Sequence, residues 1–164
     1  MTPLRAFLRD THGSAAVEQA LILPLLLILT FVGFEAGHYF YTEQKIIKAV
    51  REGARYGGRL SFTNFQCGQP TNATAVSQIQ NVTRTGTTTG TKARVVGLEL
   101  GDITVTHRCD ANFANSGIFK GTTGGAPIVL VYARTNYNSI FEALGLMDST
   151  AIVQASSEAV VNGI

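Results

Sequence analysis

The 164-residue chain is poor in the residue types that usually build catalytic or metal sites. It contains three histidines and two cysteines, and no histidine belongs to an HExxH pattern. The cysteines are too far apart for a CxxC pair or a zinc-ligand spacing. No GxSxG and no GxxxxGK[ST] sequence occurs, which argues against a hydrolase nucleophile elbow and a phosphate-binding loop. These absences predict a protein that is not an enzyme and has no metal, cofactor or small-molecule substrate.

Charged residues are also scarce, at 15% of the chain with a net charge of +2. Binding to nucleic acid requires basic side chains clustered on one face. The densest basic stretch, residues 45–55, is interrupted by Glu52 and preceded by Glu43. We therefore expect no nucleic acid partner.

One segment has almost no charge at all. Residues 15–34 contain a single charged residue, Glu18, and about 20 apolar residues suffice to cross the hydrocarbon core of a bilayer. Tyr-Phe-Tyr at 39–41 follows where an interfacial aromatic belt is expected. A secretory signal peptide would have a shorter apolar core and a small-x-small cleavage site. The pattern predicts one retained membrane-spanning helix.

The helical pattern continues beyond this span. An apolar face recurs at helical spacing through Ile46, Ile47, Val50 and Ala54. We predict one helix from Ser14 to about Tyr56, roughly 60–65 Å long, which is about twice the thickness of the hydrocarbon core. Its second half must then project into water as an amphipathic stem. A proline inside it, at position 24, is tolerated in membrane helices.

The remaining residues predict a small head of class α+β. "TNATAVSQIQNV" reads as a helix capped by Thr71 or Asn72, and the Thr/Gly-rich residues 83–92 as an exposed, mobile loop. "NSIFEALGL" reads as a helical turn. Strand character is found in "KARVVGLEL", "DITVTHRC", "APIVLVYART" and "STAIVQASSEAVV". An antiparallel sheet of three or four strands, packed on the apolar face of the stem, would bury every apolar face.

Cys67 and Cys109 both follow the membrane span. An even pair in a small extramembrane domain fits a disulfide formed in an oxidising compartment, although two unrelated buried thiols remain the alternative. Basic residues occur on both sides of the span and do not decide its orientation. With the cysteines, we predict a single-pass protein of the bacterial inner membrane, its N-terminus cytoplasmic and its head periplasmic.

Glu18 is the unusual residue of the span. A carboxylate within a bilayer costs about 2.5–3.5 kcal/mol and usually indicates a function or a partner. The alternative is an N-terminal helix carboxylate favoured by the macrodipole. Gly33 and Gly37 form a GxxxG, which lets helices approach closely in lipid and predicts a helix-packing interface.

The surroundings of Glu18 resemble the type IV prepilin class: a basic leader, Gly13, small residues, the glutamate and an uninterrupted apolar helix. More narrowly, the stretch from Gly13 to Arg59 resembles the TadE-like family. Members of that family carry G-x-A-A-V-E, a Leu-rich run with an internal proline, and an A-x-R-E-G-A-R stem. That stem corresponds here to Ala49–Arg55. The final strand segments resemble the family more loosely, residues 60–94 do not, and Gln19 replaces the aromatic residue that usually follows the glutamate.

This resemblance implies a pseudopilin of the tight-adherence (Flp) pilus machinery. A prepilin peptidase would cleave between Gly13 and Ser14, and Glu18 would pair with the N-terminal amine of a neighbouring subunit. The implied partners are this peptidase, other pilins or pseudopilins, and the assembly platform of the inner membrane, with incorporation at a pilus tip as one destination.

The expected organisation is a leader (1–13), a transmembrane helix (14–41), a stem (42–59) and a head (60–164). Two alternatives remain open. One is an anchored periplasmic binding protein that keeps its leader, and the other is a structural pilus subunit. The residue at which the mature chain starts distinguishes the first alternative, and abundance in sheared filaments distinguishes the second.

Overall fold

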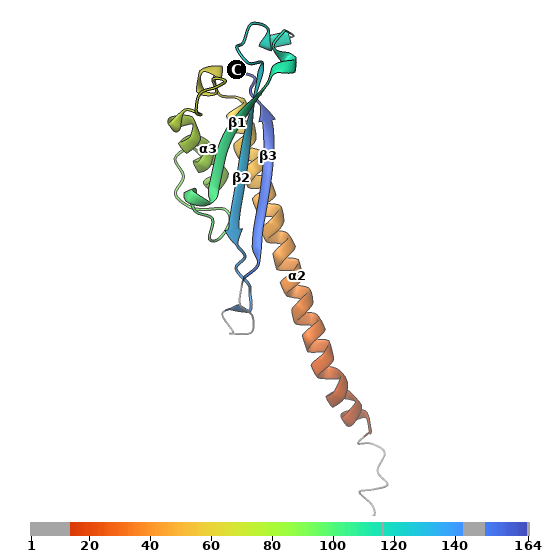
Figure 1. Cartoon of the computed structure of the whole chain (residues 1–164). Helices are drawn as coiled ribbons and strands as arrows, with labels where there is room; N and C mark the ends of the chain where they lie inside the picture. Colours follow the sequence, from red (N-terminus) through yellow and green to blue (C-terminus); the bar gives the residue numbers. More distant parts are fainter. Residues whose placement is uncertain (1–13, 116, 143–149, 164) are drawn as a thin grey trace, which may run out of the picture. The chain divides into compact units, whose positions relative to one another are not determined.

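The structure, a computed structural model, describes residues 14–115, 117–142 and 150–163. The chain forms two compact units, residues 1–38 and residues 39–164. Helix α2, Ser14–Gly58, contributes to both units (Figure 1). The expected helix is therefore present, and it ends two residues later than predicted.

The first unit is described from Ser14 onward and is helical throughout. Its large apolar side chains, among them Leu21 and Phe34, are exposed all around the helix. Pro24 lies inside the helix, and the Thr30 hydroxyl donates a hydrogen bond to the Leu26 carbonyl over 2.7 Å. A helix that is apolar on every side is typical of a membrane span. Its length and composition fit a single-pass membrane anchor.

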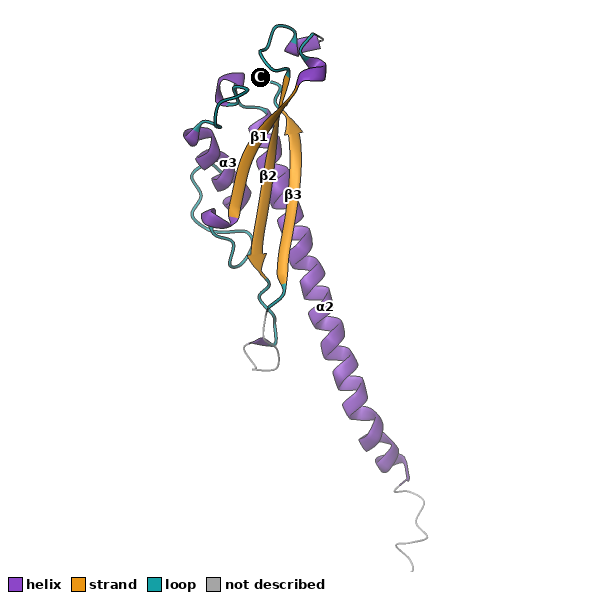
Figure 2. Cartoon of the chain, in the orientation of Figure 1, coloured by secondary structure: helices purple, strands orange, loops and turns teal. Residues whose placement is uncertain are grey.

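The second unit is an α+β head, as predicted (Figure 2). Its sheet contains β1 (Ile103–Asp110), β2 (Ala126–Asn136) and β3 (Ile152–Val160) in the order β1-β2-β3, with both pairs antiparallel. Helix α3 spans Ala73–Thr85. Short 3-10 helices occupy Phe62–Asn64 (η2), Leu100–Asp102 (η3), Ala111–Phe113 (η4) and Gly117–Phe119 (η5).

The core of the head lies between one face of the sheet and the two helices. Ile46, Val50 and Ala54 of α2 are fully buried in it, together with Ile79 of α3 and strand residues such as Val131. Complete burial of one such aliphatic side chain contributes about 1.5–3 kcal/mol. The second half of the long helix is therefore the central element of the head, and the strands alternate buried and exposed residues against it.

The prediction of a strand at residues 92–100 is wrong. This segment is irregular and ends in η3, although Val95 and Leu98 are buried in the core. Between them Val96 is exposed and Gly97 has a left-handed φ of 78°. A chain that turns at a left-handed glycine cannot continue as a strand, so the apolar residues act as two anchors of a loop.

The structure also agrees only in part with the prediction of a loop at residues 83–92. Its first three residues complete α3, whose end is Gly86 with a left-handed φ of 86°. Asn72 rather than Thr71 caps the start of α3, with its side chain accepting the Thr74 N–H over 2.8 Å. The Arg84 side chain donates hydrogen bonds to the carbonyls of Thr91 and Leu98 and so ties the loop to the helix. The helical turn predicted at "NSIFEALGL" is described only up to Glu142, and its residues 143–146 lie outside the described residues.

Candidate functional site

The start of α2 carries the residues predicted to serve processing and assembly. Ser14 is the first helical residue, and Gly13 lies outside the described residues. The Glu18 side chain is exposed, and the first turn of the described helix contains no acidic residue. Because the helix macrodipole acts mainly within the first turn, it stabilises a carboxylate at this place weakly. Glu18 is thus an exposed carboxylate at the beginning of an apolar helix, open to a partner.

Gly33 and Gly37, the predicted packing residues, leave open space at the helix surface. A methyl group added at either position would meet no atom within 4 Å. Residues four apart lie on the same side of a helix. This side of α2 therefore has room for a second helix at close range.

The stem motif of the sequence has a clear role within the head. Gly53 lies directly against Thr83 of α3, where an added methyl carbon would be 2.0 Å from the threonine hydroxyl oxygen. Ala54 is buried, and Glu52 forms a salt bridge with Arg94 of the loop after α3. The glycine-alanine pair therefore permits the crossing of α2 and α3, and the acid ties α2 to the following loop. Neither partner could be identified from spacing, because both lie 30 or more positions away.

Cys67 and Cys109 form a disulfide with a Cα–Cα distance of 5.9 Å. It joins the loop after η2 to the end of β1. Gly124, in the loop before β2, lies against the bridge, since a methyl group added there would be 2.6 Å from the Cys67 Cβ. Its φ of 89° also requires a glycine. Three segments that are distant in the sequence thus meet at this covalent link.

His107 supports the same region. Its two ring nitrogens lie 2.7 Å from the Thr71 hydroxyl oxygen and 3.2 Å from the Gln66 carbonyl oxygen, and Phe65 packs edge-on against the ring. Both nitrogens are engaged in holding the 66–71 segment on β1. Within the described ranges, no group of three or more histidine, cysteine and acidic residues is placed to hold a metal ion.

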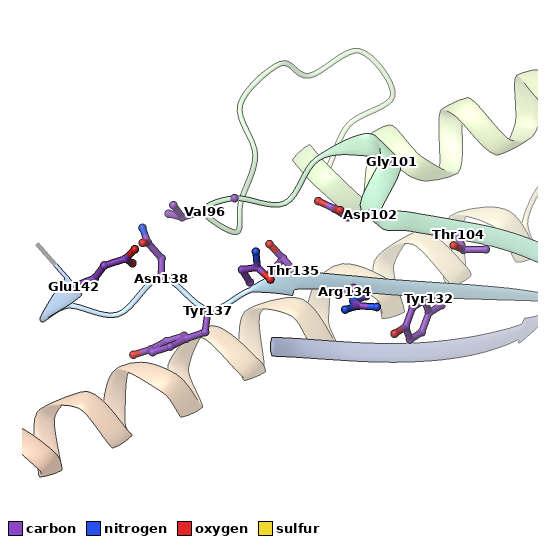
Figure 3. Close-up of a pocket in the computed structure, with 12 residues that line it drawn as sticks. Val96, Gly101, Asp102, Thr104, Tyr132, Arg134, Thr135, Tyr137, Asn138 and Glu142 are labelled. Atoms are coloured by element: carbon purple, nitrogen blue, oxygen red, sulfur yellow. The ribbon is translucent and has the colours of Figure 1, made fainter. Parts of the chain in front are cut away.

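A groove of about 720 Å³ lies at the end of the sheet where β2 finishes (Figure 3). Polar side chains line it, including Asp102, Tyr132, Arg134 and Glu142. The Asp102 carboxylate accepts the Glu99 N–H over 2.9 Å, so its first role is to cap η3. The described lining contains no histidine, cysteine or lysine. Its polar groups are carboxylate, guanidinium, hydroxyl and amide side chains.

Comparisons with known proteins relate part of the chain to a described family. No curated protein and no solved structure matches the chain. Residues 13–55 match the family described as TadE-like protein. The matched range begins at Gly13, includes Glu18 and the whole apolar run, and ends with the stem motif that packs into the head. The resemblance seen in the sequence is confirmed over this range, and the chain carries the TadE-like N-terminal segment.

Proposed function

We propose that this protein is a minor pilin or pseudopilin that takes part in the assembly or initiation of a tight-adherence (Flp) pilus. The observation that carries the proposal is the TadE-like match over residues 13–55, which includes an exposed Glu18 in an otherwise uncharged helix segment. A TadE-like segment indicates a pilus-related role. The head adds a disulfide-linked α+β unit.

In this proposal a prepilin peptidase removes residues 1–13, and Glu18 becomes the fifth residue of the mature chain. Its carboxylate then pairs with the N-terminal ammonium group of a neighbouring subunit. An unpaired carboxylate in the bilayer costs about 2.5–3.5 kcal/mol, so pairing in an assembled complex removes a penalty that the single subunit bears. The unpaired charge thereby favours correct neighbours over random helix contacts.

The proposed location is the bacterial inner membrane, with the N-terminus in the cytoplasm and the head in the periplasm. The Cys67–Cys109 disulfide supports this orientation, because disulfides persist in oxidising compartments. The partners are the prepilin peptidase, other pilins or pseudopilins that contact α2, and the assembly platform.

The first test is the intact mass and N-terminal sequence of the protein from membranes of cells with and without the prepilin peptidase. We expect a start at Ser14 only when the peptidase is present. A bulky substitution, Gly13→Leu, should leave the full-length chain uncleaved even in its presence. A start at Met1 in both strains would refute processing and favour the anchored binding protein.

The second test separates membrane insertion from assembly. Glu18→Ala removes the only charge between residues 15 and 34, so the chain should remain in the membrane fraction after carbonate extraction while pilus formation is lost. Gln19→Ala, the adjacent polar position, is the matched control and should assemble normally. Normal piliation by Glu18→Ala would refute the pairing.

A further inference from the structure

Exposed apolar side chains gather at one end of the head unit. On α2 they are Phe40, 61% exposed, and Tyr41, 57% exposed. In the connection between β2 and β3 the corresponding residue is Ile140, 47% exposed.

The packing of α2 on β2 places these residues at the same end. Gly57 of α2 lies against Val129, and the ring of Tyr39 packs edge-on against Tyr137 with centroids 5.2 Å apart. The helix rises roughly 27 Å from Tyr39 to Gly57, and the strand rises roughly 26 Å from Val129 to Tyr137. The two elements thus run antiparallel and cover nearly the same distance between these two contacts. Residues that follow Tyr137 continue past the level of Tyr39.

Local hydrogen bonds define the described part of this connection. The Tyr137 N–H donates to the Ala151 carbonyl over 2.8 Å and closes the base of the connection. The buried Ser139 hydroxyl accepts the Phe141 N–H over 3.1 Å, which forms a tight turn. Ile140 lies between these two residues and is held with its side chain outward.

The neighbouring helix residues have the composition of a membrane interface. Lys45 Nζ lies 4.5 Å from the centroid of the Tyr41 ring, and Phe40 is exposed beside it. Aromatic rings at headgroup level and long basic side chains that reach toward water are typical of the boundary of a membrane span. In the chain, Tyr41 follows the uncharged run that ends at Phe34 by seven residues.

We propose that the described part of the connection after β2, residues 137–142, inserts Ile140 into the interface of the same bilayer that α2 spans, near the level of Phe40 and Tyr41. Lipid is the partner of this surface, because α2 continues from this end of the unit into the segment that spans the bilayer. The described charges nearby have both signs, with Lys45 and Arg134 opposed by Glu43 and Glu142. The contact therefore depends on apolar insertion and does not require anionic lipid.

This second contact restrains the head. A span alone lets a head tilt and swivel about its exit point, whereas a loop resting in the interface some distance from the helix defines one face as the membrane-facing face. This orientation of the head relative to the bilayer does not depend on the proposed pilus role.

The chain contains no tryptophan, so Ile140→Trp introduces a single fluorescent reporter. The full-length variant would be reconstituted in phosphatidylcholine vesicles, with and without lipids brominated at a shallow acyl position. The matched control is Ile118→Trp. It is 65% exposed in η5, in the connection between β1 and β2, at the opposite end of the sheet.

We expect the Ile140→Trp emission to be blue-shifted relative to the Ile118→Trp emission and quenched by the brominated lipid, with the control unquenched. The same result should hold in high salt. Red-shifted, unquenched emission from position 140 would refute the proposal. A blue shift without quenching would also refute it, since it would show burial against protein. Thermal unfolding with the wild-type midpoint verifies that each variant is folded.

Discussion

Replacing Gly53 by alanine should destabilise the head, although alanine is the better helix former. The added methyl carbon would lie 2.0 Å from the Thr83 hydroxyl oxygen and 3.2 Å from its Cβ. Thr83 is fully buried, and its hydroxyl donates to the Ile79 carbonyl over 2.8 Å. The threonine must therefore rotate within a packed core, or α2 and α3 must separate.

The magnitude follows from three terms. Overpacking of a core by a methyl group costs about 1–3 kcal/mol. Rotation of the Thr83 hydroxyl away from its acceptor loses a hydrogen bond worth about 0.5–1.5 kcal/mol. The higher helix propensity of alanine offsets these losses by about 1 kcal/mol. We expect the free energy of unfolding of the head to fall by about 1–3 kcal/mol, or about 3–5 °C in melting temperature for each kcal/mol in a unit of this size.

The assay is thermal unfolding of the full-length protein in detergent micelles, followed by the near-ultraviolet circular dichroism of its tyrosines. Gly37→Ala is the matched control, because it makes the same change on the same helix where no atom lies within 4 Å. In a Thr83→Ala background, Gly53→Ala should be neutral or stabilising, since the clashing hydroxyl is gone. If Gly53→Ala were at least as stable as the wild type, the close crossing of α2 and α3 would be refuted.

Two other substitutions test the covalent and the ionic links of the head. Cys67→Ser with Cys109→Ser should lower the free energy of unfolding by about 3–4 kcal/mol, because a bridge across 42 residues restricts the unfolded chain; a melting temperature unaffected by the double change or by reductant would contradict this. Glu52→Gln should lower it by less than about 1 kcal/mol, and less still in high salt, because both members of its salt bridge with Arg94 are about half exposed. A loss above about 2 kcal/mol would show that this pair is more than a surface interaction.

The elements in which apolar residues recur with a clear helical or strand period were predictable from the sequence. The long helix follows from an apolar run that passes into an amphipathic pattern, and β1 follows from the alternation of Ile103, Thr104 and Val105. The start of α3 was predictable to within one residue, because Thr71 and Asn72 are both preferred capping residues, and the structure uses Asn72. In each case the local signal and the tertiary packing favour the same structure.

The incorrect predictions concern segments whose structure is determined by contacts with distant residues. Residues 92–100 contain enough β-branched and aliphatic residues to suggest a strand, but Gly97 turns the chain and leaves Val95 and Leu98 as separate anchors. The contact of Gly53 with Thr83 could not be predicted from the sequence either, because a glycine in a helix does not indicate which distant element packs against it. The open space around Gly33 and Gly37 is compatible with the predicted helix-packing interface, which stays a prediction.

The burial of Ile46, Val50 and Ala54 has a practical consequence for anyone who wishes to study the head in solution. The same residues that read as a stem in the sequence fill the centre of the folded unit, so a truncation at residue 60 would remove the hydrophobic core together with the anchor. A soluble fragment has to begin no later than about Tyr39, where the compact unit begins.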